Sequence, residues 1–169
     1  ADKNYNLSPK IKNDIIKLLA HSSGHTGIAG GQELDLKFEK KRKSFKEILN
    51  MQKKKTGKLF SFCLSAVGAV ANRGPLEIKY LKNLGEEIGL LFQLADDFLD
   101  IKGSKKLVGK LIRKDKKKGK STLVDLIGYK KANKYAYNLK KKILLKLKKH
   151  GKKAKDLEDT IEFILKRKF

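Results

Sequence analysis

Near the middle of the chain, Asp96, Asp97 and Asp100 place three carboxylates in a segment that is otherwise apolar. Side chains three or four positions apart share one face of a helix, so these acids and Gln93 are expected on the same side. Like charges at this spacing disfavour an isolated helix, which suggests a compensating cation. Mg²⁺ prefers one or two carboxylates together with waters and phosphate oxygens. The spacing therefore predicts either a magnesium half-site or an acidic face paired with lysines.

The rest of the chain is strongly basic. Its 169 residues include 42 Lys and Arg against 18 Asp and Glu, which gives a formal net charge of +24. Such a charge could neutralise nucleic-acid phosphates. However, only four of these residues are arginine, the usual base-reading side chain, and the lysines are spread over the whole sequence. A basic nucleic-acid-binding helical protein stays an alternative, but the composition favours solvated surface charge and no nucleic-acid partner.

Length and composition predict one all-α domain over residues 1–169, because prolines are few and the alternation typical of strands is scarce. Cys63 is the single cysteine, which excludes an internal disulfide and suits a reducing compartment. No apolar run approaches the roughly 20 residues that span a bilayer, and the polar N-terminal segment does not resemble a signal peptide. The expected location is the cytoplasm, without a membrane span.

Apolar residues recur with helical spacing in six segments. These predicted helices cover residues 8–23, 44–72, 76–101, 121–128, 130–149 and 154–167. Residues 24–31 are rich in glycine and predict either a loop or a helix that another backbone approaches closely. The lysine-rich residues 102–120 are expected to form a loop, and Cys63 is expected in the core. The pattern predicts an antiparallel helical bundle.

Residues 89–100 (GLLFQLADDFLD) resemble the second aspartate-rich motif of the trans-isoprenyl diphosphate synthases, closest to the bacterial farnesyl diphosphate synthases. Four further segments are similar to that family, in the same order along the chain. They are residues 30–36 (GGQELDL), 54–59 (KKTGKL), 109–122 (a lysine loop ending in GKST) and 126–132 (LIGYKKA). Five ordered segments make this resemblance far more specific than any one of them.

The resemblance implies an isoprenoid synthase helical bundle that acts in prenyl transfer. An allylic diphosphate, geranyl or dimethylallyl, would ionise, isopentenyl diphosphate would attack the resulting cation, and loss of a proton would give farnesyl diphosphate. The implied cofactor is Mg²⁺, and the implied assembly of the full-length enzyme is a homodimer. Geranylgeranyl diphosphate is the alternative product. A non-catalytic prenyl-synthase-like subunit is a further alternative, which the intact motifs disfavour.

The resemblance also implies a role for each matching acidic or amide residue. Asp96 and Asp100 would hold Mg²⁺ against the allylic diphosphate, and Asp97 would assist as a ligand or as a neighbour of the ligands. Gln32 and Asp35 match a segment that lines and orders the same cavity, although both could instead be polar residues that hold helices together.

The matching lysines and the residues beside them would contact the substrate. Lys55, Lys110 and Lys120 would bind the diphosphate and neutralise the charge that it carries away. Thr56 and Gln93 would line the cavity near the allylic carbons, where their oxygen dipoles would favour a developing cation. The other lysines of these segments are expected to be solvated surface residues.

The chain departs from the family in what it lacks. Family members are about twice as long and carry a first aspartate-rich motif, DDxx(xx)D, on an earlier helix, but residues 1–95 hold no such motif. The 169 residues are therefore expected to be the C-terminal portion of a polyprenyl synthetase domain, an incomplete bundle. We expect this polypeptide alone to be inactive as a prenyltransferase.

Overall fold

The computed structural model describes residues 7–39, 41–107 and 122–167, and of residues 102–107 only the backbone. Within these ranges every regular element is a helix, so the all-α prediction is confirmed. The elements are α1 (Pro9–Ser23), α2 (Ile28–Phe38), α3 (Phe45–Gln52), the π-helix η1 (Lys53–Gly57), α4 (Lys58–Val70), α5 (Pro75–Leu107), α6 (Leu123–Ile127), α7 (Tyr129–Leu147), the 3₁₀-helix η2 (Lys148–Ala154) and α8 (Lys155–Lys166).

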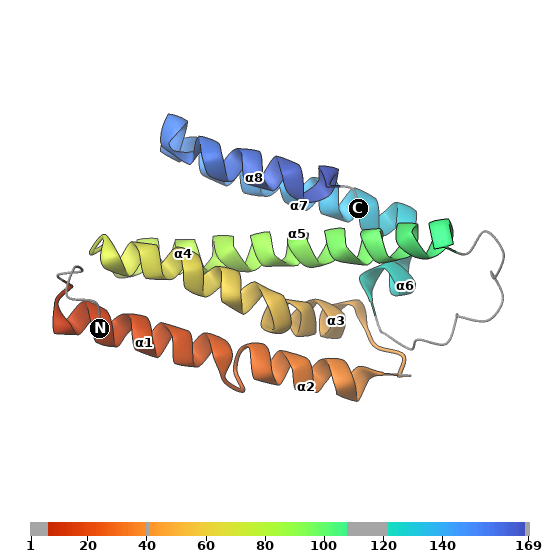
Figure 1. Ribbon diagram of the computed structural model, residues 1–169, viewed down its shortest axis with the longest axis horizontal. Coiled ribbons are helices and arrows are strands. Elements are labelled where there is room, and N and C mark those ends of the chain that lie inside the picture. Colours follow the sequence, from red (N-terminus) through yellow and green to blue (C-terminus); the bar gives the residue numbers. More distant parts are fainter. Residues whose placement is uncertain (1–6, 40, 108–121, 168–169) are drawn as a thin grey trace.

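Helix α5 runs through the middle of the bundle (Figure 1). Its 33 residues extend over about 50 Å at 1.5 Å per residue. The α3–η1–α4 segment packs on α5, α1 and α2 pack on that segment, and α7 and α8 cover another side of α5. Fully buried side chains from these helices form one core, among them Ile48, Leu84, Leu91, Leu94, Ile143 and Ile161. The middle of α5 is therefore held from several directions.

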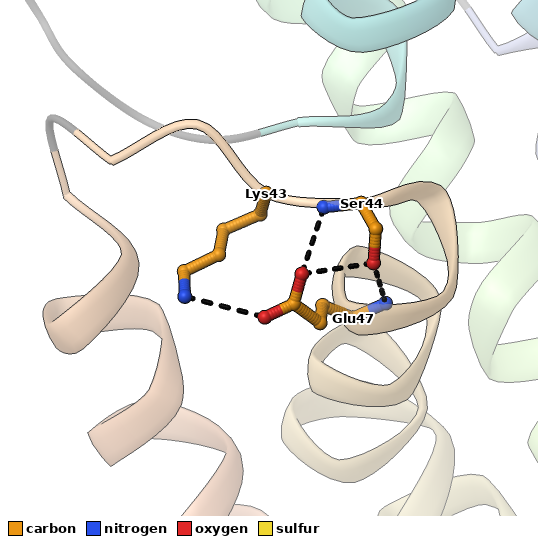
Figure 2. A network of polar contacts seen from close by, with 3 residues as sticks. All are labelled: Lys43, Ser44 and Glu47. Atoms are coloured by element: carbon orange, nitrogen blue, oxygen red, sulfur yellow. Dashed lines mark hydrogen bonds and ion pairs between the residues drawn. The ribbon is translucent and has the colours of Figure 1, made fainter.

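Side-chain caps explain where two of the helices begin. The Ser8 hydroxyl accepts a hydrogen bond from the Ile11 amide at 3.3 Å, and a proline follows Ser8, as predicted for the first helix. At the start of α3, the Glu47 amide donates to the Ser44 hydroxyl at 3.3 Å, while the Ser44 amide donates to the Glu47 carboxylate at 2.8 Å (Figure 2). Lys43 adds an ion pair to Glu47 at 3.2 Å. This reciprocal capping satisfies two backbone donors and fixes the entry into α3.

The helix predicted over residues 44–72 runs without a break from Phe45 to Val70, but it contains the π-helix η1, which the apolar periodicity did not predict. The wider π turn shifts the helix face that follows it. As a result, Cys63 is exposed rather than buried in the core, and Val67 keeps 66% of its surface exposed. The buried face of α4 instead carries the small residues Ser61, Ser65 and Gly68.

Glycines bring η1, α4 and α5 into direct backbone contact. A Cβ atom built on Gly89 would lie 2.6 Å from the Cα of Gly57, and one on Gly85 would lie 2.5 Å from the Cα of Ser61. Real Cβ atoms do not approach other atoms so closely, so a larger side chain at either glycine would push the helices apart. Small residues are therefore what allows this close approach.

The glycine-rich residues 24–31 form both of the structures that their sequence allowed, a loop and a helix. Residues 24–27 form a turn, and α2 begins at Ile28. A Cβ on Gly31 would lie 2.3 Å from the backbone nitrogen of Lys55, so α2 rests directly on η1. This part of the chain is thus a helix that another backbone approaches closely.

The boundary predicted after residue 101 was also wrong, because α5 continues to Leu107. Gly103 lowers helix stability by about 1 kcal/mol relative to alanine, but the lysines around it are good helix formers. Residues 108–120 of the predicted loop lie outside the described residues. None of the helices in the described part of the chain combines the length and apolar character needed to cross a membrane.

We predict that Gly89→Ala destabilises the fold by about 1–3 kcal/mol, because the new methyl group would overlap the backbone at Gly57. In an open helix the same change would stabilise the chain by up to about 1 kcal/mol. Urea unfolding followed by circular dichroism measures the difference. Gly74→Ala is the control, since no atom lies within 4 Å of a Cβ there, and it should cost less than Gly89→Ala because only the preference of the helix start for glycine is lost. Equal stability of the two variants would contradict the close packing.

Candidate functional site

Helix α5 presents the predicted aspartates beside a buried apolar face. Leu90, Leu91 and Leu94 are at most 2% exposed and anchor this part of the helix in the core. Asp96 is half-buried and Asp100 is exposed, one turn further along. The rigid core therefore holds these two carboxylates at the border between protein and solvent.

Asp97 differs from its neighbours because it is buried, with 7% of its surface exposed. One carboxylate oxygen accepts a hydrogen bond from the Gln52 amide at 3.1 Å, and the other accepts one from the Gln93 amide at 3.0 Å. Gln93 in turn accepts a hydrogen bond from the Thr56 hydroxyl at 2.9 Å. This polar network, Gln52–Asp97–Gln93–Thr56, joins α3 and η1 to α5.

Burial raises the pKa of Asp97 from its usual value to about 6. The hydrogen bonds from Gln93 and Gln52 favour the charged form, but they do not offset the loss of solvent, and the charge of Asp100 raises the pKa further. Burial also raises the pKa of Asp96, against the opposing effect of Arg167. Carboxylates with raised pKa values are common at functional sites.

Gln52 was missed by the sequence analysis, although the structure places it in the polar network. Its side chain is 3% exposed and its Oε1 atom has no hydrogen-bond partner among the described residues. The available signal was position: Gln52 follows Ile48 by four residues and so lies on the buried face of α3. A polar side chain at such a buried position needs a hydrogen-bond partner on a neighbouring helix.

Lys55 lies in η1, directly before Thr56, and its ammonium group pairs with Asp35 of α2 at 2.5 Å. About a third of the Lys55 side chain and a fifth of the Asp35 side chain stay exposed. The close contact of Gly31 with the Lys55 backbone holds α2 at the distance that this pair requires. Lys55 therefore pairs with α2, whereas its neighbour Thr56 pairs with Gln93 of α5.

Arg167 is a second residue that the sequence analysis missed. It follows α8, and its guanidinium group pairs with the Asp96 carboxylate and donates to the Phe92 carbonyl at 3.2 Å. The guanidinium carbon also lies 4.2 Å from the centre of the Phe92 ring. The two paired residues are 71 positions apart in the sequence, so no local pattern indicated this contact.

The remaining predicted site residues do not take part in the Gln52–Asp97–Gln93–Thr56 network. Gln32 lies on α2 with an exposed side chain. Lys110 and Lys120 lie outside the described residues, so their assignment stays a prediction. A cleft of about 950 Å³ opens between α1, α4 and α5, but none of the predicted site residues lines it. The candidate site is therefore defined by polar contacts and not by this cleft.

The chemistry of the two more accessible carboxylates suits a divalent cation. Asp96 and Asp100 offer hard oxygen ligands one helical turn apart, which matches the one or two carboxylates that Mg²⁺ prefers. Asp97 is less suited as a direct ligand because both of its oxygens already accept hydrogen bonds. Among the described residues, no group of three or more His, Cys, Asp or Glu side chains converges on one point. The donor set is thus an open half-site and not a closed protein cage.

Comparison with known proteins decides the family. The sequence pattern described as polyprenyl synthetase matches residues 3–164. The chain belongs to the polyprenyl synthetase family. The resemblance inferred from its motifs is thereby confirmed. The chain is also 36% identical over 125 residues to the farnesyl diphosphate synthase of Micrococcus luteus, covering 74% of this chain and 43% of that protein.

Two further relatives show how much of such a protein this polyprenyl synthetase chain spans. It is 32% identical to the farnesyl diphosphate synthase of Escherichia coli (strain K12), over 95% of this chain and 55% of that protein. The crystal structure of a geranyltransferase from Helicobacter pylori, complexed with magnesium and isoprenyl diphosphate, superimposes with a TM-score of 0.76 at 29% identity. The match covers 96% of this chain and 54% of that one. The chain therefore spans about half the length of its relatives.

We predict that Asp97→Asn stabilises the fold at pH 8 and leaves its stability unchanged at pH 3.5. The pKa of Asp97 is raised to about 6 in the folded chain, so folding favours the protonated acid. This contribution is complete below the pKa of the unfolded chain and is lost as the pH rises through 6. Above pH 7 the folded protein must bury a charge that asparagine does not carry. The gain in unfolding free energy should be on the order of 1–3 kcal/mol.

Urea unfolding of both proteins between pH 3.5 and pH 8 provides the measurement, and the difference between them isolates Asp97 from all other titrating groups. Asp159→Asn on the exposed face of α8 is the control, and its difference from the unsubstituted chain should not follow the same pH curve. A stability difference for Asp97→Asn that is constant over this range would contradict a buried, proton-favouring site.

Proposed function

We propose that this polyprenyl synthetase acts in a prenyltransferase that condenses an allylic diphosphate with isopentenyl diphosphate to give farnesyl diphosphate. The described residues would form the part of the site that holds the allylic diphosphate. The observation that carries the proposal is the Gln52–Asp97–Gln93–Thr56 network, which joins the segment on both sides of Lys55 to the aspartate helix. The names of the Micrococcus luteus and Escherichia coli relatives support farnesyl diphosphate as the product.

In the reaction, the allylic carbon–oxygen bond breaks and diphosphate leaves with the electron pair. The double bond of isopentenyl diphosphate then forms the new carbon–carbon bond, and a proton is lost. The difficult step is the departure of a multiply charged anion, so preorganised positive charge near its oxygens lowers the barrier. Lys55, Lys110 and Lys120 would supply such a charge.

Asp96 and Asp100 would hold Mg²⁺, which when bound neutralises charge on the diphosphate. Asp97 would fix the orientation of Gln93, because its carboxylate accepts a hydrogen bond from the Gln93 amide group. The Gln93 amide oxygen, which accepts a hydrogen bond from the Thr56 hydroxyl, would present its dipole toward the allylic carbons. Asp35 would keep the Lys55 ammonium group in place until the diphosphate arrives.

We propose four further features of the complete enzyme. Residues 1–169 would be the C-terminal part of its synthetase domain. The complete enzyme would form a homodimer, and it would work in the cytoplasm. Gln32 would line the substrate cavity, from its exposed position on α2.

We predict that the chain binds geranyl diphosphate more tightly with Mg²⁺ than without it, and that Asp96→Asn with Asp100→Asn reduces this affinity at least about tenfold. The direction of the change is informative. Removing two negative charges makes a protein of net charge +24 more attractive to anions, so unspecific binding would become stronger. Only binding through a metal on these carboxylates would become weaker. Isothermal titration calorimetry measures both constants.

The matched control is Asp156→Asn with Asp159→Asn, which removes two exposed carboxylates from α8 and changes the net charge equally. Its affinity for geranyl diphosphate with Mg²⁺ should stay the same or rise slightly. If both double variants bind the ligand as tightly as each other, the metal is not held by Asp96 and Asp100.

Lys55→Gln should weaken binding of geranyl diphosphate by at least about tenfold, because a charged hydrogen bond to the diphosphate is lost. Lys54→Gln removes the same charge one residue earlier, and it should have less than about a twofold effect if attraction by the net charge is all that changes. Equal effects of the two substitutions would remove Lys55 from the proposed site.

The chain alone should not turn over geranyl diphosphate and isopentenyl diphosphate with Mg²⁺, because the described residues provide one half-site for a reaction that needs both substrates held together. A radiometric assay with labelled isopentenyl diphosphate is sufficient. Formation of farnesyl diphosphate by the purified chain would overturn this expectation.

A further inference from the structure

Arg167 meets α5 at the carboxylate that the proposed cation would need. Its side chain keeps only 19% of its surface exposed and contacts three groups of α5: the Asp96 carboxylate, the Phe92 carbonyl and the Phe92 ring. The same terminal nitrogen, Nη2, serves both Asp96 and Phe92. The contact therefore ties the end of α8 to the aspartate helix.

The contact does not satisfy the whole guanidinium group. Nε of Arg167 is buried and has no hydrogen-bond acceptor among the described residues. Burying a donor that lacks a partner costs free energy, which offsets part of the gain from the ion pair. The arginine is therefore held at Asp96 less firmly than its number of contacts suggests.

We propose that Arg167 is a resident counter-ion at Asp96, and that a divalent cation must displace it in order to bind there. The inference rests on the proposed function, which assigns the cation to Asp96 and Asp100. One positively charged guanidinium and one divalent cation compete for the same carboxylate oxygen, Oδ1 of Asp96. Asp100 is exposed, so the competition concerns one of the two proposed ligands.

Competition of this kind links the cation to the end of α8. Because the coupling between two binding equilibria is reciprocal, loss of the Arg167 contact must raise the affinity for the cation, and the cation must loosen the Arg167 contact. The backbone amide of Arg167 donates to the Phe163 carbonyl at 2.9 Å and closes the last turn of α8. The amides of this turn can therefore report the release of the side chain.

The test measures Mn²⁺ binding to the full 169-residue chain by electron paramagnetic resonance of the free ion. Arg167→Gln should bind Mn²⁺ about tenfold more tightly than the unsubstituted chain, within the usual range for coupled sites. Lys166→Gln is the matched control. It removes the same charge from the preceding residue, whose side chain is 72% exposed and pairs with Glu162, and it should change the affinity less than about twofold.

The variant Asp96→Asn distinguishes a failure of the counter-ion role of Arg167 from a failure of the proposed cation site. In the Asp96→Asn background, adding Arg167→Gln should give no tighter binding, because the shared oxygen ligand is gone. Circular dichroism checks that each variant is folded. If Arg167→Gln behaves like Lys166→Gln while Asp96→Asn still weakens Mn²⁺ binding, the counter-ion role is wrong and the cation site stands. If Asp96→Asn has no effect either, the proposed cation site is wrong as well.

Hydrogen exchange on the unsubstituted chain gives a readout that needs no variant of Arg167. Adding Mg²⁺ should speed exchange of the amides at the C-terminal end of α8, including that of Arg167, and this acceleration should be absent in Asp96→Asn. Unchanged exchange at Mg²⁺ concentrations that saturate the site would overturn the inference, because the cation would then bind without displacing the arginine.

Discussion

Direct backbone contact between η1–α4 and α5 is the constraint on which the rest of the described site depends. Gly57 and Gly89 meet without side chains between them, as do Gly85 and Ser61. Thr56 lies next to Gly57, and Gln93 lies one turn beyond Gly89. Their hydrogen bond at 2.9 Å is therefore a consequence of how closely the two backbones approach. Interiors pack too densely to tolerate a wider spacing without rearrangement.

A buried carboxylate at Asp97 costs stability at neutral pH. Its two amide partners stabilise the charged form, yet its pKa still rises to about 6. An asparagine would avoid the cost of burying a charge, but its single amide oxygen could accept from only one of these two amides in their present orientation. The proposed cation at Asp96 and Asp100 would offset part of this cost.

Only some of the many lysines contribute to the stability of the fold. Several half-buried acids pair with lysines across helices, as Asp35 does with Lys55 and Glu87 with Lys146. At Glu87, burial alone would raise the pKa, but hydrogen bonds from Lys146 and Lys142 lower it below the usual value. Exposed lysines contribute little to stability by comparison. Arg167 stands apart because a planar guanidinium can contact the carboxylate, the carbonyl and the ring of α5 together.

The amino-acid sequence alone was sufficient to predict the helical class, the positions of most helices and the family. Amphipathic periodicity and capping residues such as Ser8 act within a few positions, so they can be read locally. The motif around Asp96 could likewise be recognised from its own residues.

Only the tertiary structure showed the features that depend on contacts between residues far apart in the sequence. The exposed position of Cys63 follows from the π turn and from the small residues that face α5. The hydrogen bond of Gln52 to Asp97 spans 45 positions, and the contact of Arg167 with Phe92 spans 75. Such pairs meet only because packing brings separate helices together, and helical periodicity carries no information about which helices will be neighbours.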